Sequence, residues 1–216
     1  MPLQNRILPT GAIVAHPSKE GLFMGNRGML HDAATRTLGR RLWQHRHWVV
    51  CVTERKGRTR SIMAKGQYTE LFFLDDAVAL AAGHRPCGAC RHADLKAYAA
   101  ALSQGAEKAP AAAEIDVALH RARVDPLSCA QITMRADART LPDGAYILVE
   151  GMPWLVLGDR ILRYTPAGYD AARARPGSIV TVLTPGPSID ALRGGFVPVL
   201  HPTAAGARIR SAVRLS

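Results

Sequence analysis

The sequence lacks the long apolar runs, leader segments and nucleotide-binding loops that define several common protein classes. No apolar stretch approaches 18 residues, and no basic-then-apolar start precedes Ala15. These absences argue against a membrane span and against secretion, so we expect a cytoplasmic protein without a membrane partner. The chain also contains no Walker loop, no GxGxxG that opens a helix, no GxSxG and no HExxH. The usual sequence signatures of nucleotide binding, serine hydrolysis and zinc proteolysis are therefore missing.

Cysteine and acidic residues are also scarce. The 216 residues include four cysteines, and 17 Asp and Glu stand against 28 Lys and Arg, which gives a formal net charge of +11. Few cysteines in a reducing compartment are more often metal ligands, nucleophiles or core residues than disulfides. An excess of positive charge favours a polyanionic partner, and we expect nucleic acid, DNA rather than RNA. The alternative is a solvated, arginine-rich surface.

The positive charge is concentrated in residues 36–65, where nine Lys and Arg accompany a single acid, Glu54. Arginine suits both phosphate binding and stacking on bases, and a tryptophan beside it can stack on an unpaired base. The alternative for each tryptophan is a place in the core. The residues expected to contact nucleic acid are Arg40, Arg41, Arg46, Arg55, Lys56, Arg58, Arg60, Trp43 and Trp48.

The first half of the sequence predicts short strands followed by helices. Residues 1–39 are rich in turn residues and indicate short strands and loops. Residues 48–54 are β-branched and apolar, and residues 58–63 can return as a second arm after a Lys56-Gly57 turn, which predicts a hairpin. Residues 68–74 predict a further strand. Three helices follow, at residues 77–82, 94–103 and 111–124. We expect Asp75 or Asp76 to cap the first helix, and Gly83 and Gly105 to end the first and second.

The second half changes character. Strands are predicted at residues 145–150, 154–157, 160–164 and 179–183, separated by turn signals. The expected fold class is therefore α+β, with a small sheet-plus-helix module at about residues 40–105, further helices, and a β-rich C-terminal half. The expected domains are residues 1–130, which are basic and contain the module, and residues 131–216.

Residues 68–91 carry a resemblance to a known family. They contain paired phenylalanines, an acid-capped alanine-rich helix, a glycine, Arg85-Pro86, and Cys87-Gly-Ala-Cys90 followed by arginine. This order and spacing resemble the end of the metal-binding module found at the N-terminus of Ada-type DNA alkylation-repair proteins. The resemblance implies a small sheet-plus-helix unit, a zinc ion held by thiolates and contact with the DNA backbone.

Cys87 and Cys90 match the second ligand pair of that family, but the first pair is absent. The family's methyl-accepting cysteine would lie in residues 57–65, which contain no cysteine. Methyl transfer requires such a thiolate, so we do not expect phosphotriester repair. A closed zinc site needs four ligands, for which Cys51 is the best third candidate and His84 or His92 the fourth, with His47 weaker.

Other interpretations of the cysteines remain open. Cys87 and Cys90 could simply precede a helix, with Cys51 and Cys129 buried as small core residues. Alternatively, Pro86-Cys87-x-x-Cys90 matches the closing half of zinc-dependent nucleobase deaminases. Their other half would have to be Cys51-Val-Thr-Glu54, which is one residue too long. The leading hypothesis is a nucleic-acid-binding protein with a zinc module, acting in DNA repair or processing. The alternative is a zinc-dependent enzyme that acts on a nucleobase or on nucleic acid.

Overall fold

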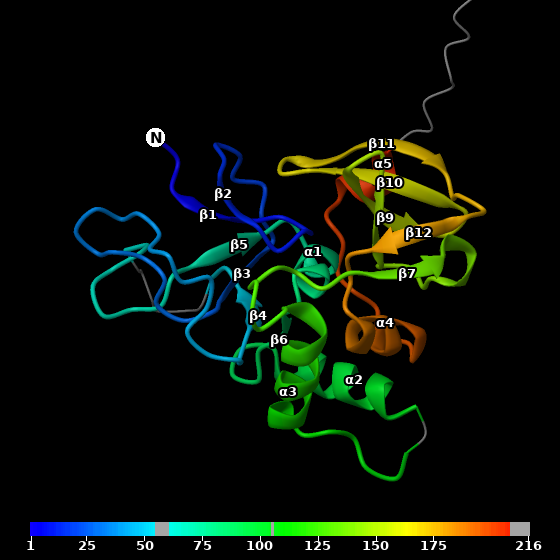
Figure 1. Cartoon of the computed structure of the whole chain (residues 1–216), viewed down its shortest axis with the longest axis horizontal. Coiled ribbons are helices and arrows are strands. Elements are labelled where there is room, and N and C mark those ends of the chain that lie inside the picture. The colour runs from blue at the N-terminus through cyan, green and yellow to red at the C-terminus, as the bar shows by residue number, and fades with distance from the viewer. Residues whose placement is uncertain (55–60, 105, 208–216) are drawn as a thin grey trace, which may run out of the picture.

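The computed structural model describes residues 1–54, 61–104 and 106–207. Within these residues the chain forms two six-stranded sheets and a group of helices (Figure 1). The predicted α+β class is confirmed. In the described part of the chain, no helix has the length and apolar character needed to cross a bilayer.

The first sheet is built from the N-terminal half of the chain and has the order β2-β1-β5-β3-β4-β6. Its strands are β1 (Gln4–Ile7), β2 (Ile13–Ala15), β3 (Phe23–Asn26), β4 (Val49–Val52), β5 (Leu71–Phe73) and β6 (Arg85–Pro86). The β1–β5 and β4–β6 pairs are parallel, and the other neighbours are antiparallel. The sheet therefore combines two sequential antiparallel pairs, β1–β2 and β3–β4, with β5 and β6, which join them through pairing of more distant segments.

The predicted strands at residues 48–54 and 68–74 are present, as β4 and β5. The predicted hairpin arm differs. Residues 61–63 form no strand, and the partners of β4 among the described residues are β3 and β6. The rest of the predicted arm, residues 58–60, lies outside the described residues. The apolar pattern of β4 therefore reflects pairing with distant strands, which local turn signals do not reveal.

Helix α1 (Asp76–Ala81) lies at the centre of the molecule. Asp75 caps it as predicted, with Oδ1 accepting a hydrogen bond from the Val78 N–H at 3.0 Å. Gly83 follows the helix with φ +77°, a conformation that favours glycine. All six residues of the helix are buried. A short helix whose residues are apolar after Asp76 belongs in an interior, and Asp76 itself is paired with Arg91.

The second sheet comes from the C-terminal half and has the order β11-β10-β9-β8-β12-β7. Its strands are β7 (Met134–Asp137), β8 (Tyr146–Val149), β9 (Met152–Leu157), β10 (Arg160–Thr165), β11 (Gly168–Ala174) and β12 (Ile179–Val182), with a short 3-10 turn η1 (Ala138–Thr140) after β7. The predicted strands are confirmed as β8, β9, β10 and β12. Strand β11 was not predicted, because its Gly, Ala and Arg content carries little β-propensity.

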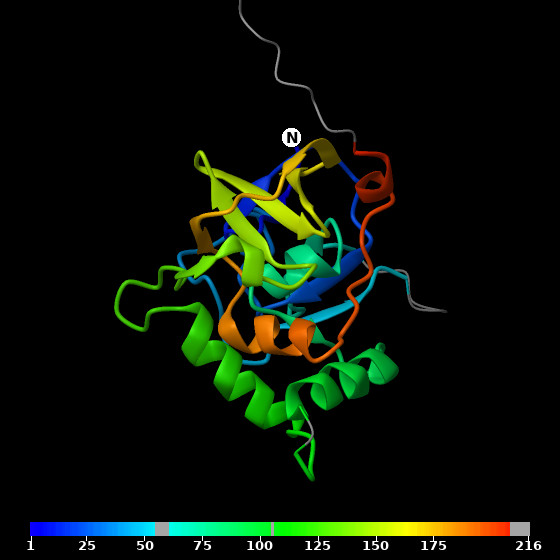
Figure 2. The same cartoon turned by 90° about the vertical axis from the view of Figure 1, so that its right-hand side faces the viewer.

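The remaining helices are α2 (His92–Ser103), α3 (Ala112–Arg123), α4 (Gly186–Arg193) and the short α5 (Thr203–Gly206). The predicted α2 and α3 are confirmed, whereas α4 was not predicted. Helices α2, α3 and α4 pack together below the sheets around Tyr98, Ile115 and Leu192 (Figure 2). Gly105, the predicted end of α2, lies outside the described residues, and Gln104 adopts the left-handed C-cap conformation.

The two sheets share a hydrophobic core around α1. One cluster of buried residues combines Phe73 and Leu74 from the first half with Leu155 and Leu162 from the second. Asp75 extends this link, since its Oδ2 accepts a hydrogen bond from the Tyr169 hydroxyl at 2.6 Å. The boundary predicted after residue 130 therefore lies between two sheets that bury side chains against each other.

Candidate metal centre

Strand pairing places Cys51 next to Cys87. Strands β4 and β6 are parallel, with Val49 opposite Arg85 and Val50 opposite Pro86. The same register continues by one residue, since the Cys87 N–H donates to the Val50 carbonyl at 2.9 Å. Neighbours in a parallel pair point to the same face of the sheet, so Cys51 and Cys87 lie side by side.

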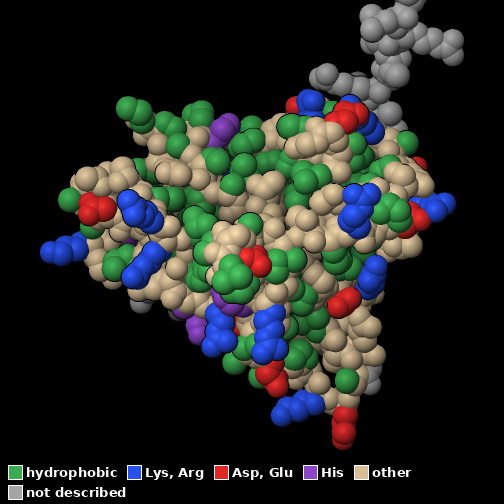
Figure 3. Space-filling model, in the orientation of Figure 1, with side chains coloured by type: hydrophobic (Ala, Val, Ile, Leu, Met, Phe, Trp, Pro, Cys, Tyr) green, Lys and Arg blue, Asp and Glu red, His purple; other side chains and the backbone are tan. Residues whose placement is uncertain are grey.

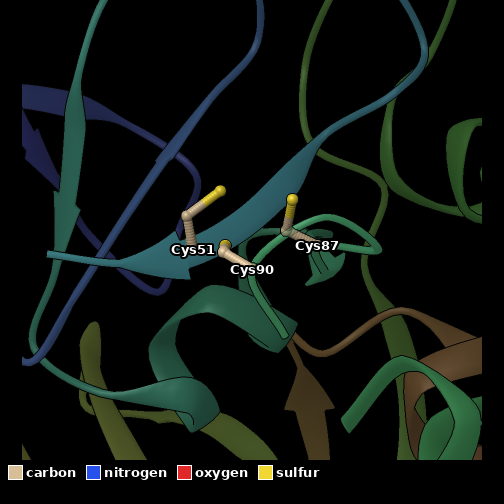
Figure 4. Close-up of side chains that lie close together, drawn as sticks. All are labelled: Cys51, Cys87 and Cys90. Carbon is tan, nitrogen blue, oxygen red and sulfur yellow. The ribbon is translucent and has the colours of Figure 1, made fainter. Parts of the chain in front are cut away.

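A tight turn then returns Cys90 to the same point. The Arg91 N–H donates to the Cys87 carbonyl at 2.9 Å, which closes the turn just before α2 begins. One ligand atom from each of Cys51, Cys87 and Cys90 lies within 4.8 Å of the others (Figure 4). All three thiols are partly exposed. The described residues contain no other such group of His, Cys, Asp or Glu side chains.

The surroundings of the sulfurs favour negative charge on Cys87. A hydrogen bond from the Cys51 thiol, together with the backbone N–H groups of Ala89 and Cys90, lowers the pKa of Cys87 to about 4. The same thiol–thiolate hydrogen bond, then burial, raises the pKa of Cys51. Burial raises the pKa of Cys90, although the Val52 N–H stabilises its thiolate. Backbone donors aimed at sulfur are suited to holding thiolates in place.

Two buried ion pairs fix the backbone on either side of the cysteines. The Arg91 guanidinium binds both Asp76 carboxylate oxygens, at 2.5 and 2.8 Å, and so ties the turn to α1. Arg85 binds both oxygens of Asp116 in α3, at 2.8 and 2.7 Å. Bidentate pairs of this kind impose a defined orientation. The thiols are thus carried by a rigid support.

The three thiols form one end of a pocket of about 400 Å³. In the sheet register, Met24 stands beside both Cys51 and Phe72, so these side chains share a face. Glu70 lies two residues before Phe72, and residues two apart in a strand also share a face. Accordingly, Met24, Phe72 and Glu70 all line the pocket with the cysteines.

Glu70 is an ionisable residue of this pocket that was not among the site residues predicted from the sequence. Its side chain is 2% exposed, and Oε2 accepts the Met63 N–H at 2.8 Å. The other oxygen, Oε1, is buried and has no hydrogen-bond partner among the residues that the structure describes. The available signal was the alternation of Tyr68, Glu70 and Phe72, which places a carboxylate on an otherwise apolar strand face. Glu54, the acid considered for a deaminase, is exposed and does not line the pocket.

None of the predicted histidine ligands joins the thiols. His84 precedes Cys87 by an odd number of residues, and it packs on the opposite face of the sheet, against Trp48 and Phe73. His47 instead binds Asp116 at 2.8 Å, and His92 is an exposed residue at the start of α2. Residues 55–60, 105 and 208–216, which lie outside the described residues, contain no Cys, His, Asp or Glu. The chain therefore offers three clustered ligands of these types.

The predicted nucleic-acid contacts fall into three groups. Arg40, Arg41 and Arg46 are exposed, and among the described residues no carboxylate lies within salt-bridge distance of them. Arg55, Lys56, Arg58 and Arg60 lie outside the described residues. Trp43 and Trp48 form the third group. On the face shown in Figure 3, basic side chains occur at several places with acids between them, so this face carries no continuous basic patch.

The tryptophans differ from each other in accessibility. Trp48 is 2% exposed, and the guanidinium carbons of Arg27 and Arg123 lie 3.9 and 3.7 Å from its ring centroid. Its ring is therefore occupied by the protein itself and is not free to stack on a base. Trp43 is half-buried beside it, with ring centroids 5.8 Å apart. Only Trp43 retains the accessibility that the predicted stacking requires.

The candidate metal centre with its pocket, and separately the exposed Arg40, Arg41 and Arg46, are thus the candidate functional features of the chain. Comparisons with known proteins add no further assignment: no protein-family model, no curated protein and no solved structure matches this sequence or fold.

Proposed function

We propose that this protein is a zinc-dependent enzyme that acts on nucleic acid or on a nucleobase. The observation that carries the proposal is the pocket of about 400 Å³ that joins three thiols to the buried, partly unpartnered carboxylate of Glu70. A structural zinc site is usually closed by four protein ligands, whereas a catalytic site has three and leaves one position for water or substrate. Cys51, Cys87 and Cys90 fit the catalytic type.

The donor set fits zinc. Soft thiolates select zinc, copper(I) or iron–sulfur clusters over hard cations such as Mg²⁺. Zn–S bonds of about 2.3 Å in a tetrahedral site place sulfurs roughly 3.8 Å apart. The observed limit of 4.8 Å between ligand atoms requires only a small contraction. Zinc bound here would supply a Lewis acid that activates water for hydrolysis.

Glu70 would supply the proton-transfer group of such a site. Its Oε2 is held by the Met63 N–H, so the carboxylate is fixed in orientation. Its Oε1 accepts no hydrogen bond from the described part of the chain, and can accept a proton or an N–H from a group bound in the pocket. A carboxylate that acts beside zinc without being its ligand is the usual acid–base arrangement in zinc deaminases. The different chain position of Glu70 leaves the reaction open to other hydrolytic chemistry.

Nucleic acid is the proposed partner because of the charge distribution. The net charge is +11, and Arg40, Arg41 and Arg46 are exposed without carboxylate partners among the described residues. In the C-terminal half, Arg139, Arg163 and Arg173 each pair with an acid, whereas the exposed Arg135 of β7 forms no salt bridge with the described residues. Unpaired guanidinium groups are the ones available to phosphates.

Cobalt substitution tests the open coordination site without knowledge of the substrate. The Co²⁺-loaded protein should show a thiolate charge-transfer band that changes on addition of azide, because an open position accepts an external ligand. The Cys129→Ser variant is the matched control, since Cys129 is exposed and outside the cluster. A spectrum of four-sulfur type that does not respond to azide would overturn the enzyme proposal.

The reaction is tested with the zinc-loaded protein and a panel of nucleosides and oligonucleotides. Release of ammonia and cleavage of phosphodiesters should be measured for wild type, Glu70→Gln and Glu54→Gln. Loss of a general acid or base typically lowers kcat by about 10²–10⁴-fold, which we expect for Glu70→Gln alone. Equal loss in Glu54→Gln, or unchanged activity in Glu70→Gln, would contradict the assigned role.

A second candidate is a nucleic-acid-binding module with a structural zinc ion, as the Ada-type resemblance implies. The tight Cys87–Cys90 turn, with backbone N–H groups directed at its sulfurs, favours this function. It predicts that removal of the metal unfolds the first sheet, whereas the enzyme proposal predicts a folded apo-protein. Far-ultraviolet circular dichroism before and after chelation separates the two.

A further inference from the structure

A second cavity, of about 170 Å³, lies on the other side of the first sheet from the thiols and contains two buried arginines. Arg27 and Arg123 are 3% and 1% exposed, and both line this cavity. Neither forms a salt bridge with a carboxylate among the described residues. Buried charges in proteins are normally paired, so two like charges around one cavity require an explanation.

The hydrogen bonds of the two guanidinium groups leave donors unused. Arg27 donates to the Gly11 and Ala82 carbonyls and, through Nε, to His84. Arg123 donates to the Gly83 and Arg46 carbonyls and to His120 Nδ1 at 3.3 Å, while its buried Nε has no hydrogen-bond partner among the described residues. Each guanidinium has five N–H donors, so both have capacity to spare.

Capping of α1 accounts for only part of this arrangement. The Ala82 and Gly83 carbonyls follow the C-terminus of α1, where cations are favourable, and Trp48 adds cation–π contacts to both arginines. A helix end carries about half an elementary charge, which balances less than one of the two guanidinium ions. The Asp116 carboxylate attracts Arg123 but is already bound on both oxygens by Arg85, so among the described residues no acid is dedicated to Arg27 or Arg123.

We propose that this cavity binds a phosphate-type oxyanion, the terminal phosphate of a nucleotide or of a nucleic-acid end. Two guanidinium groups on one cavity are the usual means of holding a phosphate. The volume of about 170 Å³ exceeds the roughly 30 Å³ of one water molecule, but falls below the 300–1,000 Å³ of pockets that enclose drug-sized ligands. A phosphate group fits, and the nucleoside attached to it would remain outside.

Thermal unfolding with inorganic phosphate tests the site directly on the full-length protein. Phosphate should raise Tm relative to chloride at the same ionic strength, by several degrees once its concentration exceeds about 100 times Kd. Leu42, which is 45% exposed, lines the cavity, so Leu42→Asp places a negative charge there without disturbing the core. We expect this variant to weaken phosphate binding by at least about tenfold, equivalent to 1.4 kcal/mol.

Two control variants separate charge at the site from other effects. Leu42→Asn changes the same side chain to a similar shape without charge, and Met152→Asp adds the same charge at a half-exposed position on the second sheet. Both should bind phosphate as wild type does. Equal weakening in Met152→Asp would reveal a general charge effect and overturn the site, as would a Tm that phosphate does not change.

Oligonucleotides with and without a 5′-phosphate identify the source of the phosphate. Tighter binding of the phosphorylated strand, lost in Leu42→Asp, supports recognition of a nucleic-acid end. Binding of inorganic phosphate with no preference between the strands assigns the site to a free phosphate or a small phosphate ester. Equal binding of both strands together with no response to inorganic phosphate would overturn the proposal. Zinc content is independent of all these outcomes, so they do not test the metal centre.

Discussion

The two faces of strand β4 carry opposite kinds of site. Val49 and Cys51 point toward the thiol pocket and are partly exposed, whereas Trp48 and Val50 point inward and are buried. On the pocket face the ionisable groups include three thiols and the Glu70 carboxylate, which favour a cation. On the inner face they include the Arg27 and Arg123 guanidinium groups, which favour an anion or an aromatic ring.

Parity along a strand decides which residues can share a site. His84 and Cys87 are close in sequence, but His84 packs beside Trp48 on the inner face, whereas Cys87 stands beside Cys51. Period-two alternation makes the separation obligatory as long as both residues continue the same strand direction. The predicted zinc ligands were chosen by their closeness in sequence, and they therefore combined residues from both faces of the sheet.

Zinc affinity gives the sharpest test of this division. Structural zinc sites with four ligands bind with about 10–16 kcal/mol, or roughly 3–4 kcal/mol per ligand, so Cys87→Ser should weaken zinc binding by roughly a thousandfold. His84→Gln should leave zinc binding within about threefold, because His84 lies on the other face. Competition with a chromophoric chelator measures both.

A folded His84→Gln protein that no longer binds zinc would contradict the assignment of His84 to the face opposite the thiols. Circular dichroism of each variant must accompany the titration, because His84 is fully buried. Cys129→Ser serves as a reference, since it removes an exposed thiol outside the cluster.

Substitutions should lower the free energy of unfolding more on the inner face of β4 than on the pocket face. Trp48→Ala removes a buried indole and the ring that contacts two guanidinium groups, and should lower the free energy of unfolding by about 3–5 kcal/mol. Val49→Ala, one residue away on the pocket face, removes partly exposed methyl groups and should cost about 1 kcal/mol. Urea denaturation measures the unfolding free energy of both variants. Far-ultraviolet circular dichroism should follow the transition, because its signal does not rely on tryptophan fluorescence. Similar losses would contradict the assigned faces.

Nucleic-acid binding should depend on the unpaired arginines outside both faces. Changing Arg40, Arg41 and Arg46 together to Gln should weaken duplex binding, and should reduce the slope of log K against log salt by up to about 2.7 if each contacts one phosphate. Changing Arg139, Arg163 and Arg173 to Gln lowers the net charge equally but removes arginines that are already paired. Fluorescence anisotropy across a salt series should separate the two triple variants. Equal slopes would remove the phosphate-contact hypothesis.

Much of the fold could be predicted because its local signals are strong. Asp75 and Gly83 delimit α1 through a side-chain cap and a positive φ, both of which depend on neighbouring residues alone. Strand β11 and helix α4 could not be predicted, since their sequences carry little β-propensity or begin at Gly186 and Pro187. Their structure is imposed by packing on the second sheet and on α2 and α3.

The candidate site was predicted in part for the same physical reason. Cys87 and Cys90 are brought together by a local turn, which the spacing reveals. Cys51 lies on the strand predicted at residues 48–54, but it reaches Cys87 through parallel pairing of that strand with β6, which the sequence did not reveal. Glu70 was missed, because its relation to the cysteines runs across β5, β3 and β4, and such pairing of distant strands leaves no local sequence signal.

The smallest expected effect concerns acid stability of the inner face. Burial, then the nearby Arg27 and Arg123 charges, hold the pKa of His84 well below its usual value of 6.5, so the folded protein keeps this imidazole neutral. The unfolded chain takes up a proton there below pH 6.5, and stability is therefore lost as the pH falls through that value. Between pH 7.5 and 5.5 the loss from one such group is about 1 kcal/mol. His84→Gln cannot take up this proton, so its unfolding free energy should fall less over the same range, while His45 and His120, whose pKa values burial also lowers, contribute to both proteins. Parallel curves for wild type and variant, measured by urea denaturation at each pH, would show that the inner face accepts a proton at His84 and would remove the electrostatic contrast between the two faces of β4.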